Sequence, residues 1–188
     1  MLQPVTNLAN PFNLPNPINP FLRYRSFMNE RDRITDLLQR AHNGDAWHGP
    51  SVMAALDGVD AAAARARPIA AGHTIWETAL HIIAWRHEVE RRMGGKAPTL
   101  PEEGDWPLVP EHDAEWARVF EHLDASHRSL IAAVRRLADA DLERPVGEEG
   151  REPGLGTGVT VAVMLHGIVA HDVYHAGQIA LLRKATAG

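Results

Sequence analysis

Residues 161–182 read VAVMLHGIVAHDVYHAGQIALL, an apolar run that contains no proline. A run of this kind favours a helix as its backbone. In a helix, residues four positions apart lie on one face, so His171 and His175 point the same way and Gln178 follows on the same stripe. Two neutral imidazoles one turn apart supply half of a metal site, which needs at least one further ligand from elsewhere in the fold.

Composition excludes several classes of protein. The 188 residues are enough for one core of ordinary size, and a formal net charge of −5 without a Lys/Arg cluster argues against a nucleic-acid partner. The run 161–182 comes closest to a membrane span, but its histidines, Asp172 and Gln178 make it too polar. The chain has no cysteine, so any metal must be held by nitrogen and oxygen. These features predict a cytoplasmic protein without a membrane or nucleic-acid partner.

Residues 1–27 differ in composition from the rest of the chain. Prolines alternate with asparagines there, and no acidic residue occurs. Proline removes a backbone donor and breaks helices, so we predict a disordered tail over 1–27. Met28 is an alternative start of the protein. The remaining residues, 28–188, are predicted to form one domain.

Capping residues and glycines in this domain mark where its helices are expected to begin and end. Asn29 is a good N-cap for a first helix that ends at Gly44, and short helical pieces follow near 51–56 and 60–67. Thr74 and Glu77 form a capping box, which starts a helix that ends near Met93.

A long helix is expected over about 114–138, then a mobile loop over 143–158, and Thr160 opens the last helix. No segment alternates as a strand would. The sequence therefore predicts an all-α fold, a four-helix bundle with extra short helices after the first helix.

His81 is the best third ligand. Bundles build metal sites from facing helices, and His81 lies in the apolar sequence ALHIIAW at 79–85, which marks a buried stripe. A lone buried histidine has a desolvation cost, and a metal ion would offset it. The residues alone therefore predict a site of His81, His171 and His175.

Four segments, taken in order, carry a resemblance to a known family: WHGPS at 47–51, HTIWE at 73–77 leading to His81, DWP at 105–107, and HDVYHAGQI at 171–179. On these segments the sequence resembles the DinB-like (DinB/YfiT-type) superfamily of metal-dependent enzymes, over about residues 29–185. The resemblance implies an up-down-down-up four-helix bundle that is often a homodimer. It also implies a divalent metal on three histidines, which match His81, His171 and His175.

Three neutral ligands leave the charge of a divalent ion uncompensated and keep coordination positions open. Zinc in such a site lowers the pKa of bound water to ~7, and the same charge ionises a thiol. The expected function is therefore a metal-dependent enzyme that activates water or a low-molecular-weight thiol, as a hydrolase or thiol transferase acting on a small-molecule substrate. Zinc, nickel, manganese and iron all suit the site. The alternative is a non-catalytic, stress-related protein that binds a metal or a small ligand.

Other residues receive narrower predictions. The resemblance places His48 near the metal pocket, where it would act as a catalytic proton donor and acceptor; alternatively, it caps the short helix near Ser51. Glu77, Tyr174 and Gln178 are candidates to orient the imidazoles. Six further histidines receive no functional role, the first five as solvated helix residues and the last as off the stripe: His42, His87, His112, His122, His127 and His166.

Two other motifs fit less well. The metalloprotease pattern His-Glu-x-x-His needs a glutamate where this chain has Asp172. The helical phosphohydrolases named for a His-Asp pair need further ligands on other helices, and Asp172 projects about 100° away from His171 around a helix. We therefore favour the three-histidine site over both.

Overall fold

A computed structural model describes residues 28–147 and 153–186 of the chain. The tail predicted over 1–27 lies outside the described residues, as does the middle of the loop predicted over 143–158. Four long helices dominate these residues: α2 (Glu30–His42), α5 (Ile75–Met93), α6 (Trp116–Arg135) and α8 (Val161–Thr186). The predicted all-α class is confirmed.

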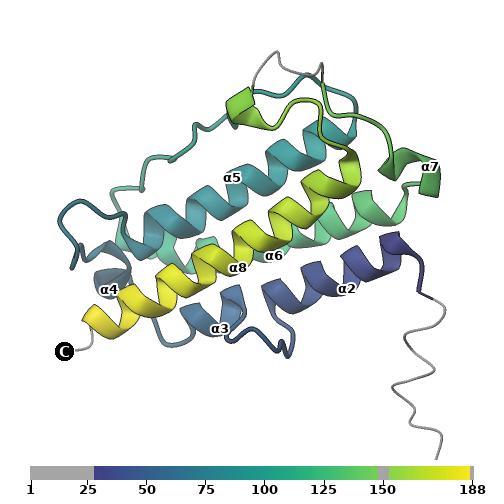
Figure 1. Ribbon diagram of the computed structural model, residues 1–188. Coiled ribbons are helices and arrows are strands. Elements are labelled where there is room, and N and C mark those ends of the chain that lie inside the picture. Colours follow the sequence, from purple (N-terminus) through teal and green to yellow (C-terminus); the bar gives the residue numbers. More distant parts are fainter. Residues whose placement is uncertain (1–27, 148–152, 187–188) are drawn as a thin grey trace, which may run out of the picture.

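The four long helices form the predicted bundle (Figure 1). Helix α5 packs against α6 and α8, and α2 packs against the same two helices from the other side. The order around the bundle is therefore α2, α6, α5, α8. Helix α2 runs antiparallel to α6, because Arg31 near the start of α2 donates to the Leu137 carbonyl just beyond the end of α6. Helices α5 and α6 run parallel to each other, and α8 runs antiparallel to α5. The topology is therefore up-down-down-up. None of the helices in the described residues is long and apolar enough to span a membrane.

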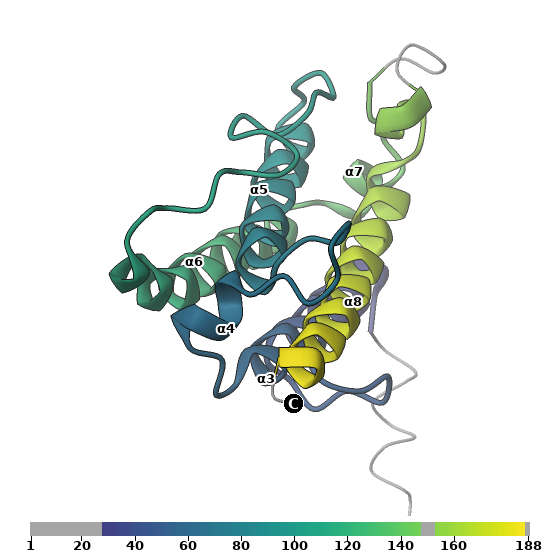
Figure 2. The same cartoon turned by 90° about the vertical axis from the view of Figure 1, so that its left-hand side faces the viewer.

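Short helices close one end of the bundle. α3 (Val52–Leu56) packs on α8, and α4 (Ala61–Arg65) packs on α5. Figure 2 shows both near the end of the bundle where α8 finishes. The two short helices after α2 confirm the prediction.

Local capping explains where these helices begin. Asn29 accepts a hydrogen bond from the Asp32 amide at 2.8 Å. At the start of α5, the Glu77 amide donates to Thr74 Oγ1 at 3.1 Å, and the Thr74 amide donates to Glu77 Oε2 at 2.7 Å, which is the predicted capping box.

The region around α6 departs from the prediction. The helix expected over 114–138 begins with a 3₁₀ turn, η1 (Asp113–Glu115), and ends at Arg135. A separate short helix, α7 (Asp139–Leu142), follows because the Asp141 carboxylate accepts from the Ala138 amide and starts a new turn. The loop predicted over 143–158 contains another 3₁₀ turn, η2 (Pro153–Leu155), and a bridge between Pro145 and Thr160.

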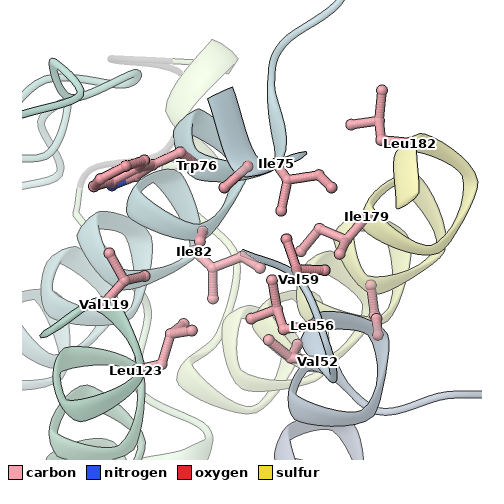
Figure 3. Close-up of a cluster of buried hydrophobic side chains, with 14 of the residues drawn as sticks. Val52, Leu56, Val59, Ile75, Trp76, Ile82, Val119, Leu123, Ile179 and Leu182 are labelled. Atoms are coloured by element: carbon pink, nitrogen blue, oxygen red, sulfur yellow. The ribbon is translucent and has the colours of Figure 1, made fainter. Parts of the chain in front are cut away.

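The core consists of two apolar clusters. One lies toward α3 and α4 and includes Trp76 of α5, Leu123 of α6 and Ile179 of α8 (Figure 3). The other lies toward α7 and includes Leu38 and Leu165. Between them, buried polar side chains form a layer across the bundle, which we call the polar layer: His42, Arg86, Ser126, His127 and Asp172.

The polar layer corrects one expectation. His42 and His127 are buried rather than solvated, and their rings stack with centroids 4.1 Å apart. Burial is the main cause that lowers the pKa of His42, and it lowers the pKa of His127 to about 3. Both rings are therefore neutral at pH 7.

These two histidines predict an acid-sensitive fold. Because the folded-state pKa values lie below the unfolded value of about 6.5, the unfolded chain binds more protons in acid. The stability that the neutral rings contribute is complete above about pH 6.5 and is lost as the pH falls toward 3. We expect the free energy of unfolding of metal-free protein, measured with denaturant, to fall between pH 7 and pH 5.

His127→Phe keeps an aromatic ring against His42 but cannot titrate, so its stability should fall less over the same pH interval. His122→Phe, at an exposed position of the same helix, is the matched control and should behave as wild type. An equal pH dependence in wild type and His127→Phe would contradict the assignment.

Candidate metal centre

Three histidines from two helices meet near the middle of the bundle. α5 contributes His81, and α8 contributes His171 and His175. The Nε2 atom of His171 lies 2.9 Å from Nε2 of His81 and 3.2 Å from Nε2 of His175. In the described residues, these three are the group of side chains that could hold a metal ion. The structure thus brings together the three histidines that were predicted from the spacing of His171 and His175 and from the apolar context of His81, and their role as metal ligands stays a prediction.

Hydrogen bonds at Nδ1 fix the tautomers of the His81 and His175 rings. His81 Nδ1 lies 2.5 Å from the Asp105 carbonyl oxygen, and His175 Nδ1 lies 2.7 Å from Gln178 Oε1. Both oxygens are acceptors, so each Nδ1 carries the proton and donates. The Nε2 atoms of His81 and His175 then turn unshared electron pairs toward the centre of the triad.

This donor set fits a divalent ion. The unshared pairs of His81 and His175 both lie close to Nε2 of His171, which carries at most one proton and can donate it to only one of them, whereas a divalent cation would be bound by all three nitrogens. Zinc binds imidazole nitrogen at about 2.0–2.1 Å, so nitrogens of a tetrahedral site are about 3.3 Å apart, close to the separations here. Three imidazoles without a thiolate also suit nickel and iron.

Burial lowers the pKa of His81 and His175 and so keeps both rings in the neutral form. His81 and His175 are buried, whereas the side chain of His171 is 24% exposed. Burial, assisted by the neighbouring His171, lowers the pKa of His81, and it lowers the pKa of His175 to about 4. Two of the three rings are therefore neutral at pH 7, which is the state that binds metal.

The comparisons with known proteins place this site in a family. The family model of the DinB superfamily matches residues 46–179, which is more than half of the chain and contains the whole triad. The chain belongs to the DinB superfamily. No curated protein and no solved structure matches the chain significantly.

A surface loop of this DinB-superfamily protein holds His81 in place. The loop between α5 and α6 supplies the Asp105 carbonyl, and the Trp106 ring stacks on His81 with centroids 4.0 Å apart. His73 stacks on the other side of Trp106 at 3.3 Å, and Trp85 Nε1 donates to the Asp105 carboxylate at 2.8 Å. The loop therefore fixes both the tautomer and the plane of the His81 ring.

The residues predicted to orient the imidazoles have different outcomes. Gln178 contacts His175 as described. Glu77 accepts from Arg67 at 2.7 Å and lies 3.6 Å from His73, so its partners lie outside the triad. Tyr174 is exposed and meets only the edge of His175, with ring centroids 5.1 Å apart.

His48 lies on the exposed loop between α2 and α3. Ser51 is the N-cap of α3, where its hydroxyl accepts from the Ala54 amide, so the capping alternative for His48 is wrong. Within the described part of the chain, His48 makes no hydrogen bond or ring contact with the triad. Its role in proton transfer stays a prediction.

Two residues next to the site were missed from the sequence. Arg86 and Asp172 are both fully buried and form an ion pair at 2.7 Å. Although burial alone would raise the pKa of Asp172, the Arg86 guanidinium holds it below its ordinary value. A sequence signal exists, because each residue interrupts an apolar stripe: Asp172 stands between Ile168 and Ala176 on α8.

An apolar groove opens on the exposed side of the triad. It has a volume of about 220 Å³ and ends at His171. Trp85 and Ile168 form part of its wall, and Gly167 leaves a gap in its rim because a Cβ there would meet nothing within 4 Å. The groove therefore borders His171, the most exposed of the three histidines.

Proposed function

We propose that this DinB-superfamily chain is a metal-dependent enzyme in which His81, His171 and His175 hold a divalent ion. The observation that carries the proposal is the convergence of the three Nε2 atoms beside a groove whose wall includes His171. A structural metal site is usually closed by a fourth protein ligand, whereas a catalytic site keeps a position open. The partly exposed His171 and its groove favour the catalytic kind of site.

A divalent ion on three imidazoles supplies Lewis-acid chemistry, which lowers the pKa of water or of a low-molecular-weight thiol. The protein supplies the rest. The buried rings and the Trp106 stack keep water away from one side of the site, and the groove orients a small substrate from the other. His48, if its loop carries it to the substrate, would move the proton that hydrolysis or thiol transfer requires.

Elemental analysis of protein purified without a histidine tag is the first test. We expect about one divalent ion per chain, and activity toward ester or thiol-transfer substrates that chelation removes and the metal restores. A chelated protein that keeps its helicity supports an exchangeable catalytic metal. One that unfolds supports the alternative, a structural metal in a non-catalytic protein. No metal after reconstitution with zinc, nickel, manganese and iron would overturn the proposal.

Because the groove borders His171, we expect it to select which small molecules can bind the metal. Leucine at position 167 has room for its Cβ and would fill the groove. In the cobalt-loaded protein, whose visible spectrum reports ligands, we expect Gly167→Leu to weaken 4-phenylimidazole by about 10–100-fold, because a phenyl ring then loses its apolar site. Binding of unsubstituted imidazole should not change.

Gly177→Leu is the matched control, since Gly177 lies on the same helix with equal room for a side chain but outside the groove. It should bind both probes as wild type does. Equal binding of 4-phenylimidazole by wild type and Gly167→Leu would show that ligands approach by another route. Homodimer formation and a cytoplasmic location remain predictions, which sedimentation and cell fractionation would test.

A further inference from the structure

A buried ion pair lies directly behind the triad. Arg86 and Asp172 are each 0% exposed, at the centre of the polar layer. Arg86 Nε and Nη2 donate to Asp172 Oδ2 at 3.0 and 2.7 Å, and Arg86 Nη1 donates to the Leu123 carbonyl at 3.1 Å. The guanidinium is thus fixed by α6 and α8 together, and it fixes the Asp172 carboxylate in turn.

The pairing leaves one carboxylate oxygen free. An arginine and a carboxylate often form two parallel hydrogen bonds that use both oxygens. Here both bonds go to Oδ2, and Asp172 Oδ1 is buried with no hydrogen-bond partner in the described residues. A buried acceptor without a partner is costly, so its presence calls for an explanation.

The atom that faces this oxygen is equally unusual. Nδ1 of His171 is also buried with no hydrogen-bond partner in the described part of the chain, and it lies 3.9 Å from Asp172 Oδ1. This separation is about 1 Å longer than a charge-assisted hydrogen bond. His171 is also the one ring of the triad whose Nδ1 lacks an oxygen acceptor, because Asp105 and Gln178 serve the other two.

A second buried carboxylate shows what a purely structural pair looks like in this protein. Glu88 on α5 is buried and pairs with Arg91 and Arg92. Its Oε2 accepts from Arg91, and its Oε1 accepts from Arg91, Arg92 and the Thr99 amide. Both oxygens of Glu88 are therefore used, in contrast to Asp172.

We propose that Asp172 is a positioning residue for the metal: its Oδ1 accepts the Nδ1 proton of His171 when Nε2 of that ring binds the ion, and Arg86 holds the carboxylate in place. The inference rests on the proposed metal site. It assigns one oxygen acceptor to each ring of the triad: a loop carbonyl, an amide and a carboxylate. A carboxylate behind a metal-bound imidazole fixes its tautomer and raises its basicity.

Zinc affinity of Asp172→Asn, measured by competition with a chromophoric chelator, tests the proposal. Asparagine keeps the size of the side chain but weakens the acceptor, and loss of such a partner lowers metal affinity by about 10–100-fold. Glu88→Gln is the matched control, because it removes a buried carboxylate paired with arginine that does not contact the triad. It should bind zinc as wild type does.

The possible outcomes separate the two proposals. A wild type that binds no metal overturns the proposed function, and this inference with it. A wild type that binds zinc, with Asp172→Asn no weaker than Glu88→Gln, overturns this inference alone. Weaker binding confined to Asp172→Asn supports it.

Nuclear magnetic resonance of zinc-loaded wild type decides the matter even if Asp172→Asn fails to fold. The proposal expects His171 to carry its proton on Nδ1, with a downfield resonance that exchanges slowly with water. Long-range ¹H–¹⁵N correlations within the assigned His171 ring identify that resonance in the wild-type spectrum itself. A His171 ring that binds zinc through Nδ1, or whose Nδ1 proton exchanges freely, would overturn the inference.

Discussion

We expect His171→Ala and His175→Ala each to reduce the metal content from about one ion per chain to none, while the far-ultraviolet circular dichroism of the bundle is retained. Each substitution removes one of only three nitrogen donors, and two imidazoles are too few for a stable site. Helicity should persist because the helix around these positions is anchored by buried apolar residues on both sides, such as Ile168 and Ile179. His81→Ala should lose the metal equally, which would show that α5 also supplies a ligand.

His166→Ala is the matched control for this experiment. His166 lies on the same helix as His171, is exposed, and pairs with Glu30 at the surface. Its replacement should leave the metal content unchanged. Stoichiometric metal in both His171→Ala and His175→Ala would contradict the three-histidine assignment.

The second large effect concerns stability. We expect Arg86→Met to lower the free energy of unfolding by about 3–5 kcal/mol, because it leaves the Asp172 carboxylate buried without a counter-charge. Urea denaturation of metal-free protein at pH 7 measures the loss. Arg86→Met combined with Asp172→Leu should recover most of it, since buried ion pairs replaced by apolar residues are often neutral in stability.

The double variant also separates two roles of the ion pair. It restores the packing of the polar layer but not the acceptor for His171. Recovered stability with persistently weak zinc binding is the expected combination. If Arg86→Met is as stable as wild type, the pair does not hold the bundle together as described.

The sequence was sufficient for the features that depend on local spacing. Asn29, Thr74 and Glu77 mark helix starts through hydrogen bonds within one turn, so their effect can be read without the tertiary structure. His171 and His175 face the same way in any helix. His81 was found because its apolar neighbours imply burial.

The features that were missed depend on which face of each helix meets a partner. Helical spacing placed Asp172 about 100° around the helix from His171, but it showed neither that this second face is buried nor that Asp172 Oδ1 lies 3.9 Å from His171 Nδ1. His42 and His127 looked solvated because polar residues surround them in the sequence, although they continue the buried sides of α2 and α6. The segment DWP at 105–107 was noted for its resemblance, but the hydrogen bond from His81 to the Asp105 carbonyl could not be predicted, since the sequence does not show where a loop carbonyl points.

The loop contact makes the orientation of one histidine of the triad depend on a surface segment outside the helices. The loop between α5 and α6 sets the tilt of one ligand through the Asp105 carbonyl and the Trp106 ring. Surface loops accept insertions and substitutions that helices reject. A change of residue or of length in this loop would therefore alter the orientation of His81 while all three histidines and the helices that carry them stay the same.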